Sequence, residues 1–194
     1  MKIANLILAA GSSSRMQSTK QVLPWRNTTL LGNALQQAEN TALLDVYLVL
    51  GANAEEIKSK IDLKKENVFL NLDWKKGLGS SIACGVTELE KLPEEYNAVL
   101  ITLADQPLID SAYLTKMVSL FSTSISTIVA TNYGDRVGVP AIFDATYFSE
   151  LKGLGQDYGA KEVLIKYAEE IVMVEPNGKE IDIDTKEDYS NLVK

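Results

Sequence analysis

Runs of apolar residues alternate with segments of helical spacing along most of the chain. The apolar runs are continuous rather than broken by polar positions, as is typical of strands in a parallel sheet that is covered on both faces. We predict strands at Ile3–Leu8, Val46–Leu50, Val68–Leu70, Ala98–Leu103 and Thr127–Ala130. Between them, apolar residues at helical spacing predict helices at Thr29–Asn40, Ala54–Ile61, Ser80–Leu89 and Asp110–Phe121.

This alternation predicts an α/β fold with three layers, in which helices cover both faces of a doubly wound, mostly parallel sheet. Thr29 and Asp110 are residue types that commonly cap helix N-termini. We see no repeat, low-complexity tract or linker. A chain of 194 residues is long enough for one well-buried core and short for two, so we expect a single domain over residues 1–194.

Composition and charge exclude several classes of function. A formal net charge of −7 argues against a nucleic-acid partner, because phosphate contacts need clustered cations. No apolar run has the length of a membrane span, and the apolar stretch after Met1-Lys2 is too short for a secretion signal, so we expect no membrane partner. The single cysteine, Cys84, indicates a reducing compartment and therefore a cytoplasmic protein. Without histidine, the chemistry must use carboxylates, lysines and metal ions.

The loop after the first predicted strand suits an anionic ligand. From Leu8 to Lys20 it reads LAAGSSSRMQSTK. Its small residues let backbone N–H groups approach phosphate oxygens closely, and Arg15 and Lys20 can add charge-assisted hydrogen bonds. We therefore predict a nucleotide-binding loop made of Leu8, Ala9, Ala10, Gly11, Ser12, Arg15 and Lys20.

Two common phosphate-binding motifs do not fit this loop. Counting from Gly11, Met16 stands where a P-loop needs its second glycine. The dinucleotide fingerprint G-x-G-x-x-G is already broken at Ser13. The sequence therefore supports neither a P-loop ATPase nor a dehydrogenase.

A second candidate site follows the strand Ala98–Leu103, where Asp105 precedes Gln106-Pro107. Ligands of doubly wound sheets bind beyond the carboxyl ends of the strands, so Asp105 and the loop are expected at the same edge. A carboxylate there can hold a hard cation such as Mg²⁺, or it can cap the next helix. Taken with the loop, a metal role is favoured.

Five blocks resemble one family in the order in which they occur. The opening follows the pattern [LV]-A-A-G-x-S-x-R-M-G-x-x-K except at Gln17, which stands where the family usually has glycine, and Leu23-Pro24-Trp25 comes after it. The later blocks are Gly79-Ser80-Ser81, Ala104-Asp105-Gln106-Pro107-Leu108, Gly138-Val139-Pro140 and Asp182-Ile183-Asp184-Thr185. Nearly end to end, the chain resembles the MobA-like nucleotidyltransferases, in particular the molybdopterin (molybdenum cofactor) cytidylyltransferase branch.

This resemblance implies a Rossmann-like nucleotidyltransferase fold and a Mg²⁺-dependent transfer of CMP from CTP to the phosphate of molybdopterin, with release of pyrophosphate. It implies catalytic roles for Arg15, Lys20 and Asp105, with Lys20 near the α-phosphate and Arg15 near the leaving pyrophosphate. The metal ligands would be Asp105 and Asp184, with Asp182 as the alternative to Asp184. The alternative to a metal-binding role is a structural one, in which Asp184 or Thr185 caps the N-terminus of a helix.

Other residues would contact the nucleoside and the acceptor. In the family, the block Gly79, Ser80 and Ser81 contacts the base and sugar, although it can also be a simple glycine turn with a serine cap. The acceptor would contact Gly138, Pro140 and Lys161. The two tryptophans could stack on a base, but we expect both Trp25 and Trp74 to be packing residues.

The acceptor is the least determined part of this hypothesis. Val139 stands where the molybdopterin enzymes usually have histidine, which keeps two alternatives open: guanylyl transfer to molybdopterin, and cytidylyl transfer to a sugar or polyol phosphate. A nucleotide-binding partner without catalysis is a further alternative, disfavoured because a pure binder does not need two metal carboxylates. A molybdoenzyme or its chaperone could receive the product.

Overall fold

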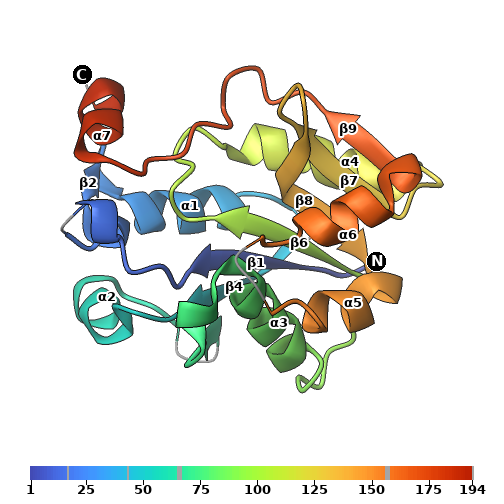
Figure 1. Cartoon of the computed structure of the whole chain (residues 1–194), viewed down its shortest axis with the longest axis horizontal. Coiled ribbons are helices and arrows are strands. Elements are labelled where there is room, and N and C mark those ends of the chain that lie inside the picture. The colour runs from blue at the N-terminus through green and yellow to red at the C-terminus, as the bar shows by residue number, and fades with distance from the viewer. Residues whose placement is uncertain (17, 43, 65–66, 156–157, 194) are drawn as a thin grey trace.

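The computed structural model describes residues 1–16, 18–42, 44–64, 67–155 and 158–193. Its main sheet contains β1 (Ile3–Ala9), β4 (Leu44–Leu50), β5 (Val68–Leu70), β6 (Ala98–Leu103), β7 (Ile128–Asn132), β8 (Val137–Asp144) and β9 (Ile171–Val174). The strand order is β5-β4-β1-β6-β8-β7-β9. Only β8 runs antiparallel to its neighbours in this sheet, so the predicted mostly parallel sheet is confirmed (Figure 1).

The helices are α1 (Leu30–Glu39), α2 (Ala54–Lys60), α3 (Leu78–Leu89), α4 (Ser111–Thr123), α5 (Phe148–Lys152), α6 (Lys161–Lys166) and α7 (Lys186–Leu192). The four predicted helices correspond to α1–α4. Both predicted caps are present: the Thr29 hydroxyl accepts a hydrogen bond from the Gly32 N–H at 3.0 Å, and the Asp110 carboxylate accepts one from the Tyr113 N–H at 2.9 Å.

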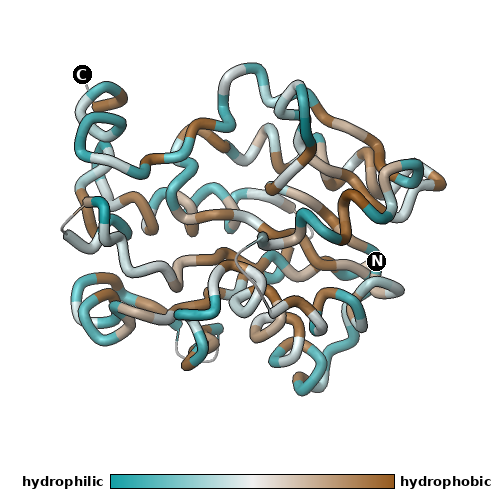
Figure 2. The backbone as a smooth tube through the Cα atoms, in the orientation of Figure 1, coloured by the Kyte–Doolittle hydropathy of each residue, from teal (hydrophilic) through white to brown (hydrophobic). Residues whose placement is uncertain are grey.

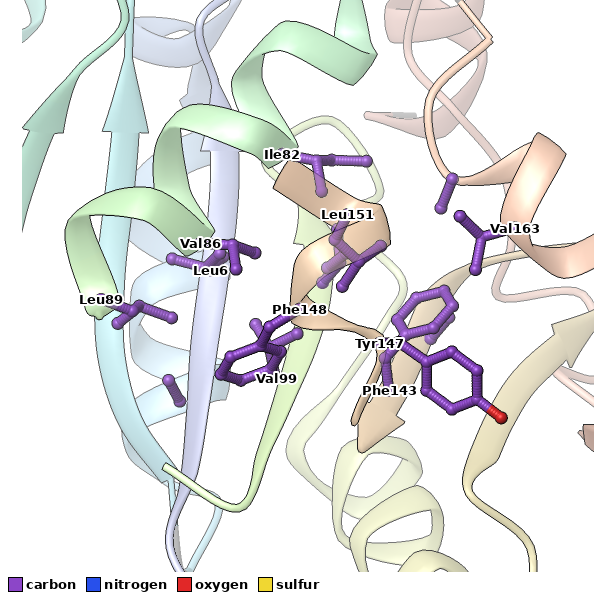
Figure 3. Packing of buried hydrophobic residues seen from close by; sticks show 14 of the residues in the cluster. Leu6, Ile82, Val86, Leu89, Val99, Phe143, Tyr147, Phe148, Leu151 and Val163 are labelled. Carbon is purple, nitrogen blue, oxygen red and sulfur yellow. The ribbon is translucent and has the colours of Figure 1, made fainter. Parts of the chain in front are cut away.

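Helices cover both faces of the sheet, which explains why its strands are continuously apolar. On one face, α3, α5 and α6 pack on the strands; Figure 3 shows Val86 of α3 close to Leu6. On the other face, α1, α2 and α4 cover the same strands. Figure 2 shows the hydrophobic residues concentrated along the central strands, with hydrophilic residues toward the periphery.

The apolar pattern did not predict β8, β9 or the short hairpin of β2 (Pro24–Trp25) and β3 (Thr28–Thr29). In β8, Gly138 and Pro140 are residue types that rarely lie inside a strand, so the pattern did not predict a strand although its last apolar residues are fully buried. In β9, four residues include the exposed Met173, so its pattern is too short to distinguish it from a loop. These strands make the far half of the sheet mixed rather than parallel.

The segment after β9 returns across the sheet before α7 begins (Figure 1). Its Ile183 is fully buried in an apolar cluster with Met16, Trp25 and Leu30. The Ile183 N–H also donates to the Asp105 carbonyl oxygen at 2.9 Å. This anchor brings the two flanking aspartates to the carboxyl end of β6. Among the described residues, no helix combines the length and apolar character needed to cross a membrane.

Candidate active site

A pocket of about 470 Å³ lies at the carboxyl ends of β1 and β6. Most of the residues predicted from the sequence to bind nucleotide or metal line it: Leu8, Ala9, Ala10, Gly11, Ser12, Arg15, Lys20, Ser81, Asp105 and Asp184. Asp182, the alternative metal ligand, lines it as well. A separate pocket of about 630 Å³ between α2 and β5 contains none of these residues. The pocket is therefore lined by polar residues from four segments that are far apart in the sequence.

The N-terminal loop, residues 10–16, presents backbone rather than side chains to this pocket. A Cβ added to Gly11 would meet nothing within 4 Å, so space is open beside its main chain. The N–H groups of Gly11 and Ser12 donate to no acceptor in the part of the chain that the structure describes. Such free donors fit an anionic ligand.

Gln21 holds this loop in shape, a role that sequence reasoning missed. Its side chain is 2% exposed, and its Nε2 donates to the carbonyl oxygens of Ala9 and Gly11 at 3.0 and 3.1 Å. Its Oε1 accepts from the Ser13 hydroxyl at 3.2 Å. Ser13 has a positive φ of 55°, a conformation that needs such support in a residue other than glycine. The sequence offered one indication of this role: Gln21 directly follows Lys20 of the predicted loop.

Lys20 connects the loop with the carboxylates. Its Nζ donates to Asp105 Oδ2, to Asp184 Oδ1 at 3.2 Å and to the Ile183 carbonyl oxygen at 3.1 Å. Burial alone would lower the pKa of Lys20, but the charges and hydrogen bonds of Asp105 and Asp184 outweigh burial and raise that pKa above its usual value. Lys20 therefore stays protonated at neutral pH and lines the pocket as a cation.

Asp184 lies between the two cations of the loop. Its Oδ2 pairs with the Arg15 guanidinium at 2.9 Å, and its Oδ1 contacts Lys20. The Arg15 side chain is 67% exposed, so this pair is open to solvent and easily exchanged for another anion. The helix-capping alternative for this segment also holds in part, because Thr185, not Asp184, caps α7.

Asp182 occupies a different environment from Asp184. Its Oδ1 accepts a hydrogen bond from Gln106 Nε2 at 2.9 Å. Although the residue keeps a solvent-exposed face, burial of its carboxyl and the nearby charge of Asp105 raise the pKa of Asp182 to about 6. Asp182 thus faces the pocket without a cationic partner among the described side chains.

The carboxylate oxygens of the pocket fit a divalent cation. Asp105 Oδ1 is buried and has no hydrogen-bond partner, so one carboxylate oxygen is left for a ligand. Within the described ranges, no group of three or more acidic or cysteine side chains could hold a metal ion by itself. Mg²⁺ needs no such cage, because it binds through one or two carboxylates, waters and substrate phosphates. Asp105 and Asp184 fit that requirement.

The glycine-rich block at residues 77–81 forms the start of α3, two residues earlier than predicted. Gly77 has φ 98°, which allows the sharp entry into the helix. Of the block, Gly77, Leu78 and Ser81 line the pocket, whereas Gly79 and Ser80 are buried outside that lining. The Ser80 hydroxyl donates to the Gly77 carbonyl oxygen at 2.8 Å. Gly77 occupies the N-cap position of α3 without a side-chain cap, so the serine cap of the alternative interpretation is not formed.

The residues predicted to contact the acceptor lie outside this pocket lining. Gly138 packs on the Tyr133 ring, and Pro140 is buried with its carbonyl oxygen accepting from Thr131. Lys161 is exposed at the first residue of α6. The nearby Gly159 packs on Leu78 of the pocket wall, so α6 begins at the edge of the pocket.

The two tryptophans differ in their surroundings. Trp25 is 3% exposed within an apolar cluster, which confirms the prediction that it packs. Trp74 is half-buried and lines the pocket, so it is not the purely packing residue that we expected. Its position could not be read from the sequence, because it depends on how the segment after β5 meets β1.

Comparison with known proteins places this geometry in a family. A family model described as "MobA-like NTP transferase domain" matches residues 5–171. The purine catabolism protein PucB of Bacillus subtilis is 28% identical over 197 residues, covering 96% of this chain and 94% of that protein. Nicotine blue oxidoreductase of Paenarthrobacter nicotinovorans is 32% identical over 106 residues, covering 54% of this chain; the match spans only 50% of that relative's length.

Among solved structures, Rv0371c of Mycobacterium tuberculosis H37Rv is similar along the whole chain. Its crystal structure has a TM-score of 0.83 and 28% identity, covering 100% of this chain and 97% of that one. A structure of Rv0371c in complex with manganese has a TM-score of 0.81 and 27% identity, with 100% and 98% covered. The predicted Rossmann-like nucleotidyltransferase fold is thereby confirmed.

Proposed function

Because this chain belongs to the MobA-like NTP transferase family and is a nucleotidyltransferase, we propose that it transfers CMP from CTP to the phosphate of molybdopterin. One observation carries the chemistry: the free donors of the N-terminal loop, Lys20 and Asp105 face a single pocket. The choice of CTP and molybdopterin rests on the likeness of the five sequence blocks to the cytidylyltransferase branch. Residues 1–194 would act as one nucleotidyltransferase domain.

In this proposal, the acceptor's phosphate oxygen attacks the α-phosphorus of the triphosphate in line. The new P–O bond forms as the bond to the bridging α–β oxygen breaks, and the electron pair leaves with pyrophosphate. A phosphate acceptor is already ionised at neutral pH, so the protein needs no strong general base. That requirement agrees with a chain that has no histidine.

The residues of the pocket would position and neutralise charge. Backbone N–H groups at Gly11 and Ser12 hold the phosphates, Lys20 faces the α-phosphate, and Arg15 faces the departing pyrophosphate. Both cations pair with carboxylates, which keeps them in the lining of the pocket. Their pairing with Asp184 is exchanged for pairing with phosphate when the nucleotide binds.

Asp105 and Asp184 would hold Mg²⁺, with Asp182 as the alternative second ligand. When bound, the cation would screen the negative charge of the phosphates and make the α-phosphorus more electrophilic. The unpartnered Asp105 Oδ1 and the manganese complex of Rv0371c support a divalent cation here.

Gly138, Pro140 and Lys161 would contact molybdopterin, and a molybdoenzyme or its chaperone would receive the product. The single cysteine supports a cytoplasmic location.

A thermal-shift panel of the four nucleoside triphosphates with Mg²⁺ tests the nucleotide. Ligand binding to the native state raises stability by RT ln(1 + [L]/Kd), so CTP should raise the melting temperature more than the other three triphosphates if the base is cytosine. Equal shifts with all four triphosphates would contradict the cytidylyl assignment.

The metal assignment is tested by pyrophosphate release from CTP and the acceptor. Asp105→Asn keeps the shape of the side chain and removes its charge, and should lower turnover on the order of 10²–10³-fold. Glu55→Gln, at a side chain that is 90% exposed on α2, is the matched control and should leave turnover unchanged. Near-normal turnover by the Asp105 variant would overturn the metal role.

A further inference from the structure

Trp74 forms the wall of the pocket on the side of β4 and β5. It begins the short turn Trp74–Lys76, and Gly51 directly follows β4. A Cβ added to Gly51 would lie 2.7 Å from the Trp74 Cβ and 2.7 Å from the Ala10 carbonyl oxygen. The missing side chain at Gly51 therefore lets Trp74 pack directly beside the first residue of the N-terminal loop.

The turn that carries Trp74 is held firmly by Asn71. The Asn71 side chain is 3% exposed, and its Nδ2 donates to the hydroxyl groups of Ser80 and Ser81 at 3.0 and 3.1 Å. Its Oδ1 accepts from the Asp73 N–H at 2.9 Å. The turn is thus tied to the start of α3, and Trp74 is positioned before any ligand arrives.

The ring of Trp74 is free to contact a ligand. In the described ranges, no other aromatic ring stacks on it and its indole N–H donates no hydrogen bond. The Lys75 ammonium lies over the ring at 5.5 Å from the centroid. A cation–π contact at an exposed site is weaker than stacking of a base on an aromatic ring, so a base can displace it.

The order of the strands tells which part of the substrate meets Trp74. In the sheet, β4 and β6 flank β1 on opposite sides, and β8 lies beyond β6. The carboxylates are at β6 and the acceptor segment Gly138–Pro140 is in β8. A triphosphate held by the loop after β1 therefore directs its reacting α-phosphorus toward β6 and its nucleoside toward β4.

We propose that Trp74 stacks on the nucleobase of the triphosphate. The inference rests on the proposed function and adds a binding residue to it. It also gives Gly51 a role, because the approach of Trp74 to the loop sets the distance between base and phosphates. A planar pterin ring could stack on the same indole, and the experiment separates these two ligands.

Trp25→Phe leaves Trp74 as the sole tryptophan and makes its fluorescence a direct probe. With Mg²⁺ present, CTP should quench this fluorescence, whereas inorganic tripolyphosphate, which has no base, should raise the melting temperature without quenching. CTP that raises the melting temperature but leaves the fluorescence unchanged would overturn the inference and leave the proposed function intact. Quenching by a free pterin but not by CTP would also overturn it. If no triphosphate raises the melting temperature, the proposed function fails together with the inference.

Kinetics provide the second test. Trp74→Ala should raise the KM for CTP roughly ten-fold, as expected for the loss of one base–aromatic stack, with the KM for the acceptor unchanged. Trp74→Phe should restore most of the affinity, because it keeps an aromatic face. Trp25→Phe is the control and should leave both KM values unchanged. An equal loss in the Ala and Phe variants, or a rise confined to the acceptor KM, would contradict stacking on the base.

Discussion

The ammonium group of Lys20 is hydrogen-bonded to the carboxylate of Asp105, although 85 residues separate them in the sequence. The same ammonium contacts Asp184, which comes from the C-terminal segment. An internal cation therefore pairs with both of the carboxylates that are proposed to bind Mg²⁺. In the proposed function, Lys20 and a metal ion would compete for the negative charge of the same two carboxylates until a nucleotide supplies phosphate oxygens to Lys20.

Lys20→Met should separate these two roles. The variant keeps most of the length of the side chain but removes the competing cation, so Mn²⁺ should bind the nucleotide-free variant more tightly than it binds the nucleotide-free wild type. Turnover should fall on the order of 10²–10³-fold, because a charge opposite the phosphates is lost. Isothermal titration with Mn²⁺ and a pyrophosphate-release assay measure the two effects. Weaker Mn²⁺ binding by the variant would show that Lys20 does not compete with the metal; Lys58→Met, on exposed α2, is the control.

Asp110 should contribute stability that is lost in acid. It caps α4 and pairs with Lys179, and these contacts outweigh burial and hold the pKa of Asp110 below its usual value. A carboxyl whose folded-state pKa is depressed stabilises the protein fully above its unfolded pKa of about 3.9, and the contribution disappears as the pH falls through the lower folded-state value.

Urea denaturation of Asp110→Ala checks this dependence. At pH 7 the variant should lose about 1 kcal/mol, the usual cost of removing an N-cap. As the pH falls through the lowered folded-state pKa of Asp110, the gap between variant and wild type should shrink, because the carboxyl becomes protonated in both states of the wild type. Asp110→Asn keeps a capping side chain and should lose less at pH 7. If the difference in stability between Asp110→Ala and the wild type does not change with pH, the ionised carboxylate of Asp110 is not the stabilising form.

The parallel half of the fold and one side of the site could be predicted from the sequence. The strands that became β1, β4 and β6 are buried on both faces, so their apolar runs are unbroken, and the loop and Asp105 follow two of them. The mixed half could not be predicted in the same way, because Gly138 and Pro140 interrupt β8.

The rest of the pocket depends on contacts that no local pattern encodes. Asp182 and Asp184 reach Asp105 because Ile183 is buried in a cluster formed by other segments. Trp74 reaches the N-terminal loop because Gly51 has no side chain. Each of these contacts is set by the packing of segments far apart in sequence. The sequence alone therefore identifies candidate residues but does not predict which of them contact one another.

Gly51→Ala should therefore damage both the fold and the site. Its Cβ would lie 2.7 Å from the Ala10 carbonyl oxygen, a backbone atom that cannot move without displacing β1. We expect a loss of about 1–3 kcal/mol in urea denaturation, as for overpacked cores, and a raised KM for CTP. Gly155→Ala, where an added Cβ meets nothing within 4 Å, is the matched control. Unchanged stability and KM in the Gly51 variant would mean that Trp74 does not need this close approach.

Tyr133 should affect the acceptor and not the nucleotide. Its hydroxyl donates to the Val139 carbonyl oxygen at 2.5 Å, within the proposed acceptor segment, and accepts from Gln106 Nε2 at 2.8 Å. Burial raises the pKa of Tyr133 to about 12, so the donor stays protonated at any working pH. Through Gln106, which also donates to Asp182, the acceptor segment is thus tied to the carboxylate side of the pocket.

Tyr133→Phe removes that hydroxyl and keeps the ring that packs on Gly138. Stability should fall by about 1 kcal/mol, since two hydrogen bonds are lost and Val139 and Gln106 each lose a partner. Because Tyr133 does not line the nucleotide pocket, the KM for the acceptor should rise while the KM for CTP stays constant. Tyr96→Phe is the matched control: it removes a tyrosine hydroxyl that bonds Tyr47 and Asp45, outside the pocket lining, and should lower stability without changing either KM. If the Tyr133 variant loses stability without a change in either KM, as expected for the Tyr96 variant, the hydrogen bond to Val139 has only a structural role.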